Sequence, residues 1–221
     1  LIFAAFNMRD KMKIKFITIF GILFLMGCSR SSVELFELAE EKLKNKQPDL
    51  ALLDLEKLIN KYPNDSLASK ALYKMFTIHL HWHHNPSSGY DVLEKLVKHF
   101  PNSKQGIQAK VDIEEYPETI LNKTESLRNK DMTKEAVNNL MYLLGNHSNN
   151  KLMPKAQYML GDIYMNDFRD FTTAIQEYRK VIVDHPGSEQ EPHALFMIGY
   201  VYANVLNDIK SAKIEYEEFL N

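Results

Sequence analysis

Residues 174–186 read Ala-Ile-Gln-Glu-Tyr-Arg-Lys-Val-Ile-Val-Asp-His-Pro, and this stretch decides the fold class. Pro186 ends the element, because proline has no amide hydrogen with which to continue a helical hydrogen-bond ladder. We therefore predict an amphipathic α-helix with a proline-marked stop. Its apolar face is formed by four residues spaced i, i+4, i+7 and i+8, namely Ala174, Tyr178, Val181 and Ile182.

The same spacing recurs along the chain. A proline closes three copies, whereas Ser148 replaces it in a fourth and the chain stops before it in a fifth. Separations of 38, 47, 38 and 38 residues between the small residues that open the copies indicate an internal repeat. The five openings are Ala51, Gly89, Ala136, Ala174 and Ala212, and the closing prolines are Pro63, Pro101 and Pro186.

A first helix is predicted before each of these second helices. Two copies share an Ala, a Gly and a Tyr at a separation of 38 residues: Ala156, Gly161 and Tyr164 in one, Ala194, Gly199 and Tyr202 in the next. One such hairpin cannot bury its apolar faces alone, whereas stacked neighbours can. The sequence thus predicts an all-α solenoid over 35–221, with about five hairpins of about 38 residues each.

The interval of 47 contains nine residues more than one repeat. Pro117 is expected to end the first helix of that repeat, which begins near Ala109, because proline interrupts the helical ladder. The extra residues then form an enlarged connection between two helices over 118–132. This connection either lengthens the helix pair or offers a partner surface on one rim of the solenoid.

Composition supports a globular helical protein and excludes several classes. The chain has 221 residues, 45% of them hydrophobic, and only 8 Gly and 8 Pro, which disfavours collagen-like, sandwich and disordered classes. Its net charge is −2, and removal of residues 1–27, which carry +3, leaves −5. Bulk charge therefore predicts no binding to nucleic acid.

The N-terminal region has the features of a bacterial export signal. From Met12, the best candidate start, a basic Met-Lys-Ile-Lys is followed by an apolar run over 16–26, too short to span a bilayer comfortably. Leu25-Met26-Gly27-Cys28 resembles a lipobox, in which a small residue admits the peptidase and the Cys thiol accepts diacylglycerol. We predict a signal peptide over 1–27 and a lipidated Cys28 with a short tether over 28–34. The alternative is an ordinary buried cysteine.

A histidine cluster is the most conspicuous polar feature. His79 and His83 are separated by one helical turn, a spacing that can bind zinc. The other interpretation is structural, because His79 occupies the position of Tyr164 and Tyr202 in other repeats. The sequence contains no Gly-rich phosphate loop, nucleophile elbow or Cys/His dyad. We therefore predict no enzymatic activity, no cofactor and no metal, with His79 and His83 as weak metal candidates.

The Gly–Tyr pairs, the opening Ala and the trailing Pro together resemble the tetratricopeptide repeat family. With Tyr-Pro-Asn-Asp-Ser at 62–66, the chain is similar to lipid-anchored envelope proteins of the BamD-like type, and secondly to the CpoB type. The resemblance implies a non-enzymatic scaffold on the periplasmic face of the outer membrane that binds envelope proteins in a groove. Partners would belong to β-barrel assembly or, alternatively, to Tol-Pal; a metal-binding lipoprotein is the alternative of another class. Groove candidates are Tyr73, Lys74, Gln157, Asp162 and Met197.

The end of the chain carries one more expectation. The repeat pattern places the next proline at position 224, three residues after Asn221. We expect the chain to be a fragment of a longer protein, with the apolar face from Tyr216 to Leu220 partly uncovered, since a solenoid needs a polar cap at each end.

Overall fold

A computed structural model describes residues 30–220, which form eleven α-helices and one π-helical turn and contain no strand. The predicted all-α fold is confirmed. None of these helices is long and apolar enough to cross a membrane. The chain divides into two compact units, 1–71 and 72–221, at a boundary within helix α4 (Ser66–His81). Cys28 and the lipobox residues Leu25, Met26 and Gly27 lie outside the described residues.

The first unit is built on the hairpin of α2 (Ser32–Lys44) and α3 (Pro48–Lys61). Ser31 begins α2 with a capping box, in which its hydroxyl accepts from the amide of Glu34 and the Glu34 carboxylate accepts from the amide of Ser31. Pro48 opens α3, where a missing amide hydrogen costs nothing. Both helices place their apolar faces against each other.

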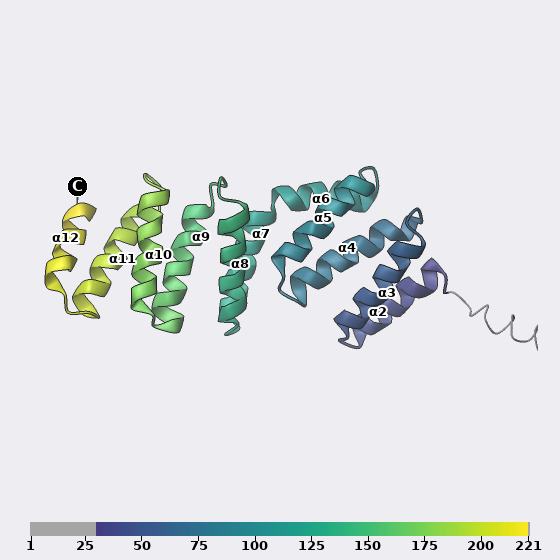
Figure 1. Cartoon of the computed structure of the whole chain (residues 1–221), viewed down its shortest axis with the longest axis horizontal. Coiled ribbons are helices and arrows are strands. Elements are labelled where there is room, and N and C mark those ends of the chain that lie inside the picture. Colours follow the sequence, from purple (N-terminus) through teal and green to yellow (C-terminus); the bar gives the residue numbers. More distant parts are fainter. Residues whose placement is uncertain (1–29, 221) are drawn as a thin grey trace, which may run out of the picture. The chain divides into compact units, whose positions relative to one another are not determined.

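The second unit contains the remaining helices, and each of α7 to α12 packs against its neighbour in the chain (Figure 1). The elements are α5 (Pro86–His99), α6 (Lys104–Glu114), α7 (Tyr116–Arg128), α8 (Thr133–Asn146), α9 (Met153–Ile163), η1 (Tyr164–Phe168), α10 (Phe171–Asp184), α11 (Glu191–Asn204) and α12 (Ile209–Phe219).

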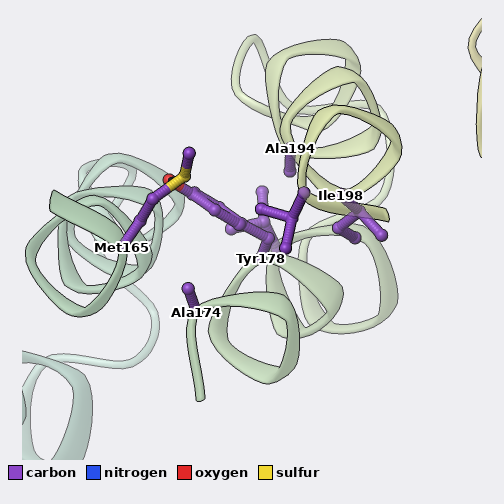
Figure 2. Close-up of a cluster of buried hydrophobic side chains, with 7 residues drawn as sticks. Met165, Ala174, Tyr178, Ala194 and Ile198 are labelled. Atoms are coloured by element: carbon purple, nitrogen blue, oxygen red, sulfur yellow. Dashed lines mark hydrogen bonds between the residues drawn. The ribbon is translucent and has the colours of Figure 1, made fainter. Parts of the chain in front are cut away.

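The small residues of the repeat lie where two helices meet. All five openings of the second helices, Gly89 included, are buried, as are Ala156 and Ala194. A Cβ on Gly161 would lie 2.7 Å from the Tyr178 ring, and a Cβ on Gly199 would lie 2.6 Å from the Tyr216 ring. Figure 2 shows Tyr178 between Met165 on one side and Ala194 and Ile198 on the other. The aromatic ring of a second helix therefore fills the space that the glycine leaves.

Every hairpin turns on one residue in the left-handed conformation. In each case this residue lies five positions before the small residue that opens the second helix. None of the five is glycine, although the left-handed region costs other L-residues about 1–2 kcal/mol. They are Lys46, His84, Asp131, Arg169 and Asn207, with φ between 49° and 59°.

The same turn corrects the predicted enlarged connection. Most of residues 118–132 belong to a helix, α7, which begins at Tyr116 and carries Pro117 in its first turn. The helix that contains Ala109 does end before Pro117, at Glu114, but Pro117 itself opens α7, where proline is tolerated. Asp131 places the left-handed turn between α7 and α8, and α7 packs on α8. The first helix of this hairpin is therefore α7, and α6, which packs on α5, is the additional helix.

The ends of the second helices also share one geometry. Tyr62, Phe100, His147 and His185 cap them with φ between −128° and −135°, and each donates its amide to the carbonyl four residues earlier. Pro63, Pro101 and Pro186 follow three of these caps. Histidine and aromatic residues thus occupy equivalent positions at the ends of the repeats.

Candidate protein-binding surface

Helix α11 presents an aromatic face that its hairpin partner α12 covers only in part. His193, Phe196 and Tyr200 share this face at i, i+3 and i+7 and are exposed, Phe196 by 45% and Tyr200 by 40%. The ring centroids of Phe196 and Phe219 lie 6.1 Å apart, so α12 supports the exposed ring from one side. Exposed apolar side chains that lie together on one face, unlike single scattered ones, are typical of a surface that binds another protein.

The aromatic face continues onto α9. The ring centroid of Tyr158 lies 6.3 Å from that of His193 and 5.3 Å from that of the buried Tyr178. Burial and the nearby Asp162 carboxylate raise the pKa of Tyr158 to about 12, so its phenol is neutral at physiological pH. We name Tyr158, His193, Phe196 and Tyr200 the aromatic strip.

Polar contacts hold α9 in place beneath the strip. The Tyr178 hydroxyl donates to Asp162 Oδ1 at 2.6 Å. Arg128, at the end of α7, donates to both carboxylate oxygens of Asp167 in η1, at 2.6 and 3.1 Å. Burial raises the pKa of Asp162, although the Tyr178 hydrogen bond and the Arg128 charge oppose the shift. These contacts join α7, η1 and α10, and so fix the orientation of α9.

The groove candidates expected from the repeat pattern fall in different environments. Gln157 is a correction: it is buried and donates to the Glu177 carboxylate, so it cannot contact a partner. Asp162 is engaged by Tyr178, and Met197 packs against the core cluster around Tyr178. Tyr73 is half-buried against Phe76, and burial with a hydrogen bond to Asp112 raises its pKa to about 12. Lys74 is also half-buried.

Sequence reasoning missed the aromatic strip because α11 is apolar on nearly every side. Ala194, Leu195, Ile198 and Val201 are buried, whereas Phe196 and Tyr200 are not. The sequence did contain a signal, which was an excess of apolar residues on this helix. A helix that packs only on its hairpin partner and on α10 needs one apolar face, whereas α11 has two.

The histidine cluster at the end of α4 packs as rings. The centroids of His79 and His83 lie 5.6 Å apart with edge-to-face geometry. Within residues 30–220, no group of three or more His, Cys, Asp or Glu side chains could hold a metal ion. Burial and the nearby Lys123 charge lower the pKa of His81 and of His84, so both are neutral at pH 7.

Comparisons with known proteins agree with this architecture. Residues 35–65 and 155–188 match the tetratricopeptide repeat family model, and these ranges contain most of the α2–α3 hairpin and most of the α9–α10 hairpin. No curated protein matched the sequence.

Several solved structures are similar to the chain. MamA shares 20% identity, with 82% of this chain and 92% of that chain covered and a TM-score of 0.40. MamA from Desulfovibrio magneticus RS-1 shares 18% identity, with coverage of 87% and 94% and a TM-score of 0.38. TPR-like repeats of a kinesin light chain from Podosopora anserina share 14% identity, with coverage of 84% and 91% and a TM-score of 0.39. The described part of the chain thus has an all-helical, tetratricopeptide-like fold in which two segments match the repeat family model, and such repeats suggest a scaffold for protein–protein interaction.

Proposed function

We propose that the chain is a lipid-anchored scaffold of the bacterial envelope that binds another envelope protein through its aromatic strip. The single observation that carries the binding part is the exposure of Phe196 and Tyr200 on one face of α11. Rigid aromatic side chains contribute a large contact area at little cost in conformational entropy, and they dominate the binding energy of many interfaces.

The anchor in this proposal is Cys28. The lipobox-like Leu25-Met26-Gly27-Cys28 supports it, and so does the position of Cys28 between an apolar run and the first repeat helix. Several acyl chains, at about 0.8 kcal/mol per buried CH₂ group, would hold the protein on the membrane permanently. Ser29 after the cysteine favours the periplasmic face of the outer membrane as the location.

For the partner we propose the β-barrel assembly machinery, as the BamD-like resemblance implies. The start of α2 at Ser32 supports this choice over the CpoB-like type, because the repeats begin directly after Cys28 and leave no room for a coiled coil. A Tol-Pal partner is the alternative, and it would be recovered in the same experiment.

The binding surface is tested by crosslinking and pull-down from membranes with the full chain. Phe196→Ser/Tyr200→Ser is expected to reduce partner recovery by at least tenfold, since a central aromatic residue contributes about 2 kcal/mol. The matched control is Ile107→Ser/Val111→Ser, which removes two apolar side chains of similar exposure from α6. Equal recovery with both double variants would contradict the assignment of the strip. Recovery of Tol-Pal proteins without barrel-assembly proteins would contradict the BamD-like partner.

The anchor is tested separately with Cys28→Ser. The variant should leave the membrane fraction and lose the mass of the acyl chains. Unchanged membrane association and unchanged mobility on a gel would show that Cys28 is not lipidated.

A further inference from the structure

A basic cavity lies in the first unit, beside the point where the chain enters α2. Its volume is about 540 Å³, and five residues line it: Arg30, Leu35, Lys57, Asn60 and Lys61. Three of these five carry a positive charge, and none carries a negative charge. A cluster of three exposed cations attracts an anionic surface.

The backbone carbonyl of Arg30 connects the two helices that border the cavity. The oxygen of Arg30 accepts a hydrogen bond from the Tyr62 hydroxyl at 2.8 Å and one from Lys61 Nζ at 3.4 Å. Ser32 Oγ donates to Asp65 Oδ2 at 2.6 Å, which also ties the start of α2 to the loop that follows α3. Residue 30 is therefore fixed beside Lys61 and does not swing away from the fold.

Apolar side chains continue the same face of α3. Leu50, Leu53, Lys57 and Lys61 fall within about a quarter of the helix circumference at 100° per residue. Leu50 and Leu53 are nearly half exposed. The face thus combines cations at the end of α3 near Arg30 with leucines one to two turns away, the pattern of a helix that lies on a membrane surface.

The position of the proposed anchor indicates what binds to this face of α3. A chain of two residues spans at most about 7 Å, so a lipidated Cys28 would lie within that distance of Arg30. We propose that Arg30, Lys57 and Lys61, with Leu53 and Leu50, form a docking surface for the headgroups of an anionic phospholipid bilayer. This inference rests on the proposed lipid anchor for its place in the cell, but the surface itself can be tested without acylation.

Acidic residues determine which face of the α2–α3 hairpin would lie on an anionic membrane. Glu34, Glu37 and Glu41 line a separate cavity of about 320 Å³, together with Arg30 and Leu38. Their carboxylates would be repelled by anionic headgroups, so α3 faces the membrane and the exposed side of α2 faces away. The anchor then holds the protein by a defined face, with Arg30 at the border between the two cavities.

The test uses the full chain with Cys28→Ser, so that acylation plays no part. Partition coefficients are measured on vesicles of phosphatidylcholine with phosphatidylglycerol and on vesicles of phosphatidylcholine alone. Residues 1–27 are the same in every variant, so their contribution cancels when the ratio of a variant is compared with that of the parent. Arg30→Gln/Lys57→Gln/Lys61→Gln is expected to lower that ratio on the order of a hundredfold, and added salt should lower the parent ratio as well.

Two further variants separate the surface from folding and from general charge. Lys98→Gln/Lys104→Gln/Lys110→Gln removes three exposed cations from α5 and α6 and should leave the ratio unchanged. Arg30→Gln/Lys61→Gln keeps the partners of the buried Asp54 intact, and it should still lower the ratio at least tenfold with an unchanged melting temperature. Equal ratios for the parent and the first triple variant would overturn the proposal. Capture of an acidic protein is the second measurement. If the first triple substitution weakens that capture but leaves vesicle binding unchanged, the proposal is also overturned. Loss of acylation alone would overturn only the anchor.

Discussion

The phenol oxygen of Tyr178 lies 2.6 Å from Oδ1 of Asp162, so a buried ring of α10 closes a hydrogen bond to the polar side of α9. The same ring contacts the site of Gly161 and stands against Met165 in the core cluster. One side chain therefore determines both the spacing of two helices and the environment of a carboxylate.

Removal of the Tyr178 hydroxyl should destabilise the fold. Tyr178→Phe leaves Asp162 without its donor and is expected to lower the free energy of unfolding by about 2 kcal/mol at pH 7, as for a hydrogen bond to a charged acceptor. Chemical denaturation measures this value. Tyr158→Phe is the control: it removes a neighbouring hydroxyl that makes no hydrogen bond within residues 30–220 and should change stability by less than about 0.5 kcal/mol.

Asp162 should also make stability depend on pH. The pKa of Asp162 in the fold is raised above the usual 3.8. The contribution of Asp162 to the free energy of unfolding is therefore full below pH 3.8 and is lost as the pH rises through the folded pKa. The side chain in Asp162→Asn cannot ionise. The free energy of unfolding of this variant should therefore rise relative to that of the parent between about pH 3 and 7. A difference that is constant across this range would contradict the raised pKa.

A methyl group at Gly161 should not fit. Its Cβ would lie 2.7 Å from the buried Tyr178 ring, so Gly161→Ala is expected to cost about 1–3 kcal/mol through overpacking. Gly145 in α8 has no atom within 4 Å of the same position. Gly145→Ala should instead stabilise by about 0.5–1 kcal/mol, because it removes backbone freedom from the unfolded chain. Thermal melting of both variants would show opposite signs; two losses would contradict the contact.

Relief of a left-handed residue should stabilise a hairpin. Arg169 has φ of 56°, and Arg169→Gly is expected to raise the free energy of unfolding by about 0.5–1 kcal/mol. Gln176→Gly, at an exposed position inside α10, should lower it by about 1 kcal/mol. Asn207→Gly should gain little, since asparagine tolerates this conformation. A loss with Arg169→Gly would indicate a native contact that outweighs the strain.

The buried carboxylate of Asp54 should depend on Lys42 far more than on Lys57. Lys42 and Asp54 form a close ion pair, and the Asp54 side chain is fully buried, whereas Lys57 is 61% exposed at 3.4 Å. Lys42→Met is expected to cost about 3 kcal/mol, since it leaves a buried charge with one weak partner. Lys57→Met should cost less than about 1 kcal/mol.

The same ion pair has a pH signature. Burial alone would raise the pKa of Asp54, but Lys42 and Lys57 outweigh it and lower the pKa below 3.8. The stability that Asp54 contributes is therefore present above pH 3.8 and is lost as the pH falls through the folded pKa. Denaturation curves of parent and Lys42→Met should converge in acid, and a gap that widens there would contradict the pairing.

The repeat could be predicted because small residues at a spacing of 38 report directly on close helix packing. Gly161 and Gly199 meet the rings of Tyr178 and Tyr216, which lie 38 residues apart in the sequence as well. Pro117 could not be assigned in the same way. A proline can follow one helix or open the next, and only the packing of Tyr116 decides: its ring is fully buried and its hydroxyl donates to the carbonyl of Pro86.

Two features of the candidate site lay beyond sequence reasoning for physical reasons. The left-handed residues escaped prediction because Lys46, His84 and Arg169 have side chains that give no local signal for positive φ. Gln157 was expected in the groove because it belongs to a first helix of the repeat, and first helices line the groove of a repeat stack. In the fold its amide meets the Glu177 carboxylate in a buried contact, and a pair of polar residues twenty positions apart is visible only once the hairpin has closed.

The constant distance between each left-handed residue and the following small residue has a consequence for how such a chain can grow. All five turns keep this spacing, while the nine additional residues of the second interval lie upstream of Asp131, where two helices, α6 and α7, precede the turn. In this chain the longer interval therefore differs between hairpins and not within a turn. The turn of each hairpin therefore behaves as a unit of constant length. The chain can differ in length between hairpins while the spacing within every turn stays the same.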